Sequence, residues 1–343
     1  MAAASSSTSG APPLGKYLAS TDKKTRDKAI KSLSSFISDP AATISKNDMT
    51  KLWKGVFYCF WMSDKPLVQQ ALASELAEIL LSVKSTSSSL AFLRGFWEMT
   101  VREWSGIDRL RIDKYYMLIR RFVNASFRLL MRDGWSSASC QEYNDILTCT
   151  GGPLCPNDSR VPASLSYHIS DIYLEELDKV LAPLPRSKPT NSSSDEEEAE
   201  GEPNSDLLPV PLATLFSPLF TLAARTISNH TYQRIQSSVF DPLFKSLSPP
   251  HSDAPPSRKR LRLTISDSDY ANVATHSCLV NPKEEGTLER TVLRKGVLKA
   301  FFAVASDQET RDSNRRKMYA LWRKNEEEDE GVSGDSDGGV DAR

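Results

Sequence analysis

Five cysteines and four histidines are the side chains that could hold a metal ion or act as nucleophiles, and they are scattered along the chain. No two cysteines have CxxC spacing; they are Cys59, Cys140, Cys149, Cys155 and Cys278. Structural zinc sites use closely spaced ligand pairs, so we expect no metal site. An odd, scattered set of cysteines indicates an intracellular, reduced protein, and Cys59 is expected to be buried within a helix.

Catalytic motifs are missing from the sequence. There is no GxxxxGK[ST] phosphate loop, no GxGxxG after a strand and no HExxH motif. The four histidines are spread over the linker-rich part of the chain, at His168, His230, His251 and His276. His168 is expected to lie at a helix boundary with a satisfied hydrogen bond. We therefore predict no catalytic residues, no cofactor, no bound metal and no small-molecule substrate.

A basic segment carries the most informative charge pattern. Between Arg102 and Arg132 there are eight basic and three acidic residues, a local net charge of +5. Lys114, Arg121 and Arg128 have heptad spacing, so we expect them to share a helix face away from the apolar stripe. Such a ridge could neutralise several phosphates. The candidate nucleic-acid-binding residues are Arg109, Arg111, Lys114, Arg120, Arg121 and Arg128. The alternative is a solvated helix face with internal ion pairs.

Aromatic residues accompany the basic ones from Thr50 to Arg132, and five of the six tryptophans lie in or just beyond this block. Trp53, Phe57, Phe60 and Trp61 recur at helical spacing. That spacing favours a packed core over a platform on which nucleic-acid bases stack.

Charge is segregated elsewhere, although the net charge is only −1. Residues 195–206 carry seven acidic and no basic residues, and residues 326–341 carry eight more acidic ones. A basic cluster in a Pro/Ser-rich stretch is typical of a nuclear-import signal; its residues are Arg258, Lys259, Arg260 and Arg262. Arg315, Arg316 and Lys317 form a second basic group.

Apolar periodicity predicts the elements that position these residues. Helices are expected at about 20–38, 48–62, 67–83, 90–104, 108–131, 141–149 and 166–181, with Lys84–Ser89 as a loop. Ser20 or Thr21 is expected to cap the first helix. Helices joined by short loops pack as antiparallel neighbours. We predict an all-α fold, an irregular α-helical repeat of the HEAT/armadillo-like α-solenoid type, with a disordered acidic linker and tail.

The expected domain organisation follows composition. We predict a disordered N-terminus (1–15), an α-helical repeat domain (16–184), an acidic disordered linker (185–206) and an additional helical segment (207–247). A Pro/Ser-rich loop (248–285), C-terminal helices (286–324) and an acidic disordered tail (325–343) complete the chain. Leu288, Val292, Leu293, Val297, Phe301 and Phe302 are expected to be buried.

The N-terminal residues lack the features of a secretory signal. Prolines interrupt the most apolar run, residues 207–224, so we expect no membrane span.

Four long segments carry a family resemblance: LASTDKKTRDKAIKSL, LWKGVFYCFWMSDKPLVQQ, FWEMTVREWSGIDRLRIDKYYMLIRR and HISDIYLEEL. In this order they resemble the nucleolar ribosomal-RNA-processing protein 1 family (Nop52 type), over about Leu18 to Leu181. The resemblance continues weakly through LRKGVLKAFFAVASDQETRDSNRRKMYALW.

The resemblance implies a non-enzymatic assembly factor of the large ribosomal subunit, located in the nucleus and nucleolus. It implies binding to pre-60S particles, precursor rRNA, other assembly factors and ribosomal proteins, and a role in processing the precursor RNA. The family supplies no catalytic residues to carry over. The competing hypothesis is a nuclear α-solenoid adaptor between proteins, with little direct RNA contact. An enzyme is a remote third reading.

Overall fold

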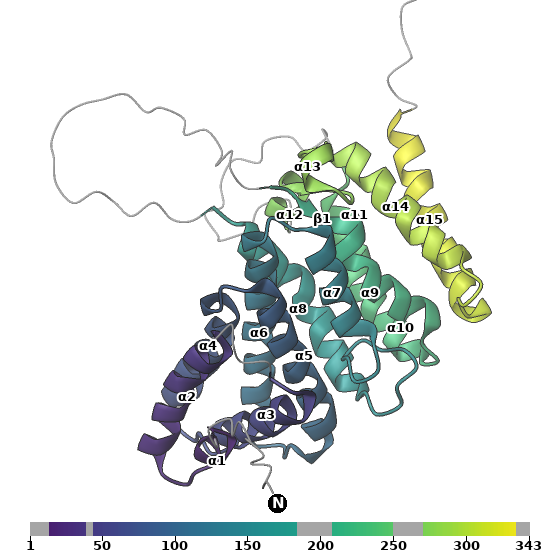
Figure 1. Cartoon of the computed structure of the whole chain (residues 1–343). Coiled ribbons are helices and arrows are strands. Elements are labelled where there is room, and N and C mark those ends of the chain that lie inside the picture. Colours follow the sequence, from purple (N-terminus) through teal and green to yellow (C-terminus); the bar gives the residue numbers. More distant parts are fainter. Residues whose placement is uncertain (1–13, 39–43, 184–207, 250–269, 334–343) are drawn as a thin grey trace, which may run out of the picture. The chain divides into compact units, whose positions relative to one another are not determined.

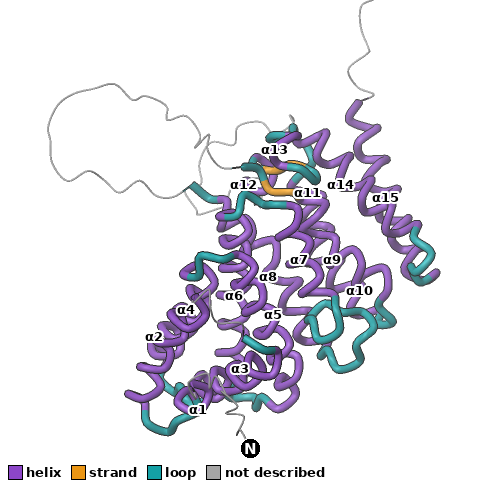
Figure 2. The backbone as a smooth tube through the Cα atoms, viewed as in Figure 1, coloured by secondary structure: helices purple, strands orange, loops and turns teal. Residues whose placement is uncertain are grey.

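The computed structural model describes residues 14–38, 44–183, 208–249 and 270–333 (Figure 1). Helices make up most of these residues, and the two strands within them are two residues long each (Figure 2). This confirms the predicted all-α, solenoid-like class. The predicted acidic linker lies outside the described residues, as do nearly all of the predicted disordered N-terminus and the last ten residues of the predicted tail.

The chain divides into two compact units. Unit 1 comprises Met1–Leu129 and Asp145–Ser166, and unit 2 comprises Leu130–Asn144 and Tyr167–Arg343. The division falls inside the predicted helical domain of residues 16–184, and the predicted domain limits stay predictions.

Unit 1 is built from helices joined by short turns. They are α1 (Leu14–Leu18), α2 (Lys23–Ser38), α3 (Lys46–Trp61), α4 (Pro66–Ser82), α5 (Thr86–Glu103) and most of α6 (Ile112–Arg132), with a 3₁₀ turn at Trp104–Gly106. Helices α7 (Ser137–Thr148) and α8 (Ala163–Leu181) also contribute residues to it.

Polar side chains fix where these helices begin. Ser45 accepts a hydrogen bond from the Asp48 N–H and caps α3, and Ser85 accepts one from the Ser88 N–H and caps α5. The predicted loop Lys84–Ser89 was therefore wrong from Thr86 on, because α5 begins there, and is confirmed only for Lys84 and Ser85. Ahead of α2, Asp22 accepts the Thr25 N–H, so the cap is Asp22 and not Ser20 or Thr21.

The core of unit 1 is a cluster of aromatic rings from α3, α5 and α6. Trp53 is fully buried, lies 4.4 Å from Phe92 between ring centroids, and donates its Nε1–H to the Phe92 carbonyl at 3.0 Å. The Phe96 and Phe122 rings stack at 3.8 Å. Each buried large side chain of this kind contributes about 1.5–3 kcal/mol. The predicted packed core is confirmed for Trp53, which has no surface left for a nucleic-acid base.

Unit 2 holds the remaining elements: β1 (Val210–Pro211), α9 (Leu212–Arg225), α10 (Asn229–Ile235), a π-helical turn (Gln236–Phe240), α11 (Asp241–Ser246), α12 (Ala271–Thr275), β2 (Ser277–Cys278), α13 (Pro282–Glu285), α14 (Arg290–Ser306) and α15 (Asp312–Ser333). Strands β1 and β2 pair in parallel, with Val210 opposite Ser277. Phe301 of α14 is fully buried and lies within 5.6 Å of the Phe220, Phe240 and Phe244 rings.

The structure of unit 2 differs from three of the predictions. The expected loop 248–285 contains α12, β2 and α13, and the expected disordered tail begins too early, because α15 extends to Ser333. Asn325 is buried and accepts hydrogen bonds from the buried Arg294, which fixes α15 at that point. Val292 and Phe302 are 49% and 36% exposed, so their predicted burial was wrong. The buried stripe of α14 lies on its other side, at Leu293, Val297, Leu298 and Phe301.

The packing of Trp53 against α5 generates a prediction. A Cβ atom added at Gly95 would lie 2.4 Å from Trp53 Cδ1, and the indole cannot move because it is buried and hydrogen-bonded. We expect Gly95→Ala to lower the free energy of unfolding by about 1–3 kcal/mol. Urea unfolding followed by tryptophan fluorescence measures the change.

Gly106→Ala is the matched control, because a Cβ atom there meets nothing within 4 Å. It should change the free energy of unfolding by no more than about 0.5 kcal/mol. Equal stability of the two variants would contradict the packing described for Trp53.

Candidate nucleic-acid interface

Lys114, the centre of the predicted basic ridge, is buried. Its ammonium donates hydrogen bonds of 2.8–2.9 Å to the carbonyls of Phe60, Trp61 and Ser63, at the C-terminal end of α3. The Phe60 carbonyl also accepts from Ser63 and the Ser63 carbonyl from Gln69, so Lys114 adds a charged donor to these two and supplies the donor for Trp61. Burial, together with Arg111, lowers the pKa of Lys114 to about 8, so the group stays protonated at neutral pH.

The prediction that Lys114 shares an exposed face with Arg121 and Arg128 was therefore wrong. Lys114 lies in the first turn of α6, where it reaches the end of α3 instead of solvent. Heptad spacing describes one helix alone and does not include what a neighbouring helix supplies.

Three further members of the predicted set have partners. Arg111 forms an ion pair with Asp108 at 2.5 Å, and its guanidinium lies 4.8 Å from the centre of the Trp61 ring. Arg128 pairs with Glu78 of α4, and the half-buried Arg120 also has a partner. Arg111 and Arg128 therefore match the alternative of internal ion pairs better than a free ridge.

Arg109 and Arg121 remain available. Both side chains are exposed, and neither forms an ion pair within the part of the chain that the structure describes. Arg109 stands next to Leu110, which is 92% exposed. Of the predicted residues, these two offer free guanidinium groups to an anionic partner.

A cavity of about 650 Å³ in unit 1 collects cations that the sequence did not bring together. Lys46, Arg102 and Arg160 line it, together with Glu98, Thr150 and Gly151. Lys46 lies 3.8 Å from the Glu98 carboxylate. Arg102 likewise pairs with Glu103 at 2.7 Å and Arg160 with Asp158 at 2.7 Å, so each cation at the wall already has a carboxylate partner. No motif links Lys46 to Arg160, because they are far apart in the sequence.

Asp158 holds the loop that forms one side of this cavity. Its carboxylate, 5% exposed, accepts hydrogen bonds from the Arg160 guanidinium and from the N–H groups of Arg160 and Gly151. The Arg160 hydrogen bond holds the pKa of Asp158 well below its ordinary value of 3.8. Gly151 has φ +89°, which favours glycine at that position.

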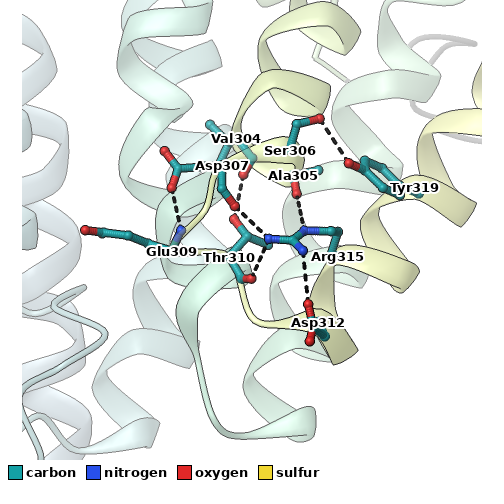
Figure 3. A network of polar contacts seen from close by, with 9 residues as sticks. All are labelled: Val304, Ala305, Ser306, Asp307, Glu309, Thr310, Asp312, Arg315 and Tyr319. Carbon is teal, nitrogen blue, oxygen red and sulfur yellow. Dashed lines mark hydrogen bonds and ion pairs between the residues drawn. The ribbon is translucent and has the colours of Figure 1, made fainter.

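The second basic group is mostly structural. The Arg315 guanidinium donates to the carbonyls of Ala305, Asp307 and Thr310 and pairs with Asp312 at 3.0 Å, closing the turn between α14 and α15 (Figure 3). Lys317 donates to the Asn229 side chain and lies 5.0 Å from the centre of the Tyr232 ring. Arg316 is the exposed member.

The remaining candidates are the import cluster, a metal site, a membrane span and Cys59. The import cluster, Arg258, Lys259, Arg260 and Arg262, lies outside the described residues. Within the described ranges no group of His, Cys, Asp and Glu side chains could hold a metal ion, and no helix is long and apolar enough to span a bilayer. Cys59 is buried as expected, and burial raises the pKa of its thiol to about 11.

Comparison with known proteins gives matches along most of the chain. A family model described as nucleolar protein Nop52 matches residues 9–323. A human protein named ribosomal RNA processing protein 1 homolog B is 42% identical over 167 residues, which are 48% of this chain and 22% of the human protein. A Dictyostelium discoideum protein named ribosomal RNA processing protein 1 homolog is 23% identical over 326 residues, 90% of this chain and 57% of that protein.

A second human relative, ribosomal RNA processing protein 1 homolog A, is 36% identical over 171 residues, 49% of this chain and 36% of that protein. The chain thus spans between 22% and 57% of the length of these relatives. The family match includes the segments that carry the resemblance in the sequence, and confirms it.

Removing the buried cation of α6 should destabilise unit 1. We expect Lys114→Met to lower the free energy of unfolding by about 1–3 kcal/mol, because the Trp61 carbonyl loses its donor and the Phe60 and Ser63 carbonyls each lose a charged one. Arg121→Met, at an exposed position of the same helix, should change it by no more than about 0.5 kcal/mol. Urea unfolding measures both, and an unaffected Lys114→Met variant would show that the three hydrogen bonds do not form.

The cavity loop should depend on pH through Asp158. Because the pKa of Asp158 is lower in the folded protein, its stabilisation is present above the ordinary value of 3.8 and is lost as the pH falls below it. Amide exchange of Gly151 and Arg160, corrected for the intrinsic rate, should accelerate in that range. In Asp158→Asn it should be fast throughout, whereas Asp113→Asn, at an exposed position, should behave like wild type. Exchange independent of pH in the wild type would contradict this role.

Proposed function

The chain belongs to the Nop52 family of nucleolar proteins, and on that premise we propose that it is a non-catalytic ribosome biogenesis factor that binds pre-60S particles. It supports the processing of precursor rRNA and the assembly of the large subunit, in the nucleus and nucleolus. Its partners are precursor rRNA, other assembly factors and ribosomal proteins.

The family match over residues 9–323 is the observation that carries this proposal, since it includes described helices of both units. The relatives named for ribosomal RNA processing support the same process. Because the chain spans only part of these relatives, the activity of the whole proteins is carried over as a proposal only.

The surface of unit 1 supports contact with an anionic partner. Arg109 and Arg121 are exposed without an ion pair in the described residues. We propose that these groups contact RNA of the particle, since phosphates dominate the affinity of nucleic-acid complexes.

The adaptor hypothesis keeps a specific observation in its favour. Arg111 and Arg128 are engaged with Asp108 and Glu78, which reduces the charge that α6 offers to RNA. If the adaptor hypothesis holds, the protein reaches the particle through other proteins, and its binding depends little on salt.

Charge reversal at the two free arginines tests the proposal. We expect Arg109→Glu combined with Arg121→Glu to reduce both co-sedimentation with pre-60S particles and crosslinking to RNA by about tenfold, because two phosphate contacts become repulsive. Unfolding by urea checks that the fold persists.

Lys24→Glu combined with Lys28→Glu is the matched control, since it makes the same charge change at exposed positions of α2. It should sediment like wild type. Co-sedimentation without any RNA crosslink in the wild type would favour the adaptor, and loss of sedimentation in the control as well would leave no special role for Arg109 and Arg121.

A further inference from the structure

Helices α14 and α15 lie side by side (Figure 1). Aromatic side chains of both helices are partly exposed. The Phe302 ring is 36% exposed and lies 4.7 Å from Trp322 and 5.2 Å from Tyr319 between centroids. The Phe302 and Tyr319 planes are 27° apart, a stacked arrangement. Trp322 and Tyr319 are themselves only partly buried. The rings therefore form a continuous aromatic surface that reaches solvent.

Four exposed cations surround these rings. Lys299 and Lys295 precede Phe302 by one and two turns of α14, and Arg316 and Arg323 lie one turn on either side of Tyr319 in α15. Residues at these spacings share a helix face. None of the four forms an ion pair with a residue whose side chain the structure describes. We call this set the aromatic–basic band: Lys295, Lys299, Phe302, Arg316, Tyr319, Trp322 and Arg323.

The band is held rigidly from both ends. At the turn between the helices, Arg315 bonds three carbonyls, and the Tyr319 hydroxyl lies 3.1 Å from Ser306 Oγ (Figure 3). At the other end, the buried Arg294 of α14 donates to the Asn325 carbonyl and side chain of α15. Rings fixed in this way lose little conformational freedom when a ligand stacks on them.

The combination of ring faces and unpaired cations selects the class of ligand. An apolar helix would cover the rings but would leave the four cations desolvated without a partner. An acidic peptide would satisfy the cations but has no planar groups for the rings. Single-stranded RNA offers both, a phosphate at each nucleotide and a base that stacks on aromatic side chains.

We infer that the aromatic–basic band binds single-stranded RNA, with bases extending the Phe302–Tyr319 stack and phosphates at the lysines and arginines. The inference rests on the proposed function, because it names a second surface through which the protein contacts precursor RNA. The exposed Glu326, Glu327 and Glu328 follow Arg323 on α15, and Glu328 lies 3.6 Å from the Arg294 guanidinium. These carboxylates are therefore at the level of Lys295 and limit the band at that end.

Two variants separate the contributions. Lys295→Glu with Lys299→Glu should weaken binding of the full chain to a labelled single-stranded RNA of roughly 12 nucleotides by about tenfold or more, and lower the salt slope by about 1.4. Phe302→Leu keeps an apolar side chain but removes the ring. It should weaken binding by roughly tenfold and leave the salt slope unchanged. Fluorescence anisotropy against salt concentration measures both, and a duplex of the same sequence should bind more weakly than the single strand.

Lys24→Glu with Lys28→Glu in α2 is again the control for charge and should bind like wild type. Wild-type affinity in both band variants would overturn the inference, and so would a band that crosslinks to protein but not to RNA. Co-sedimentation with pre-60S particles is read separately. If the wild type sediments while the band variants bind RNA normally, the inference fails and the proposed function stands. If the wild type binds RNA through the band but does not sediment, the proposed function fails instead.

Discussion

The carbonyl groups at helix C-termini need donors, and in this protein cations supply them. Lys114 bonds the end of α3, Arg294 bonds the Phe244 carbonyl at the end of α11, and Arg315 bonds the end of α14. Each of these cations comes from a different helix than the carbonyls it meets, or from the next helix across a turn. The helix ends thereby become points of tertiary contact, which fix how neighbouring helices pack within each unit.

This use of cations divides the basic residues into two classes with different consequences. Lys114 and Arg294 are buried, so their charges interact with acceptors inside the fold and not with a partner. Arg109, Arg121, Lys295 and Lys299 are exposed, and their charge acts on the surroundings. A count of basic residues along a helix mixes the two classes, which is why a local net charge overstates the anion-binding capacity of α6.

The sequence predicts the helices well where apolar periodicity is strong, as for Trp53 in α3 and Phe122 in α6. The apolar residues that recur at helical spacing are the ones that become buried. The sequence-based prediction fails where the burial of a residue depends on a neighbour that is distant in the sequence. The burial of Lys114 depends on the end of α3, and the ordering of Asn325 depends on Arg294. The cavity at Lys46 and Arg160 is likewise assembled by tertiary packing. Phe302 looked like a core residue because its type is apolar, although its position on α14 faces outward.

The bonds from Arg294 to Asn325 also bear on the order in which the chain folds during synthesis. Unit 1 contains all of its residues once position 166 has been made, so its core can close early. Unit 2 cannot satisfy the Arg294 guanidinium until α15 has left the ribosome, because Asn325 supplies two of its acceptors. Until then the guanidinium has only the Phe244 carbonyl and the Ser248 hydroxyl as partners, and its remaining N–H groups stay hydrated. We therefore expect nascent chains that stop before Asn325 to be engaged by chaperones, while unit 1 within the same chain is already native.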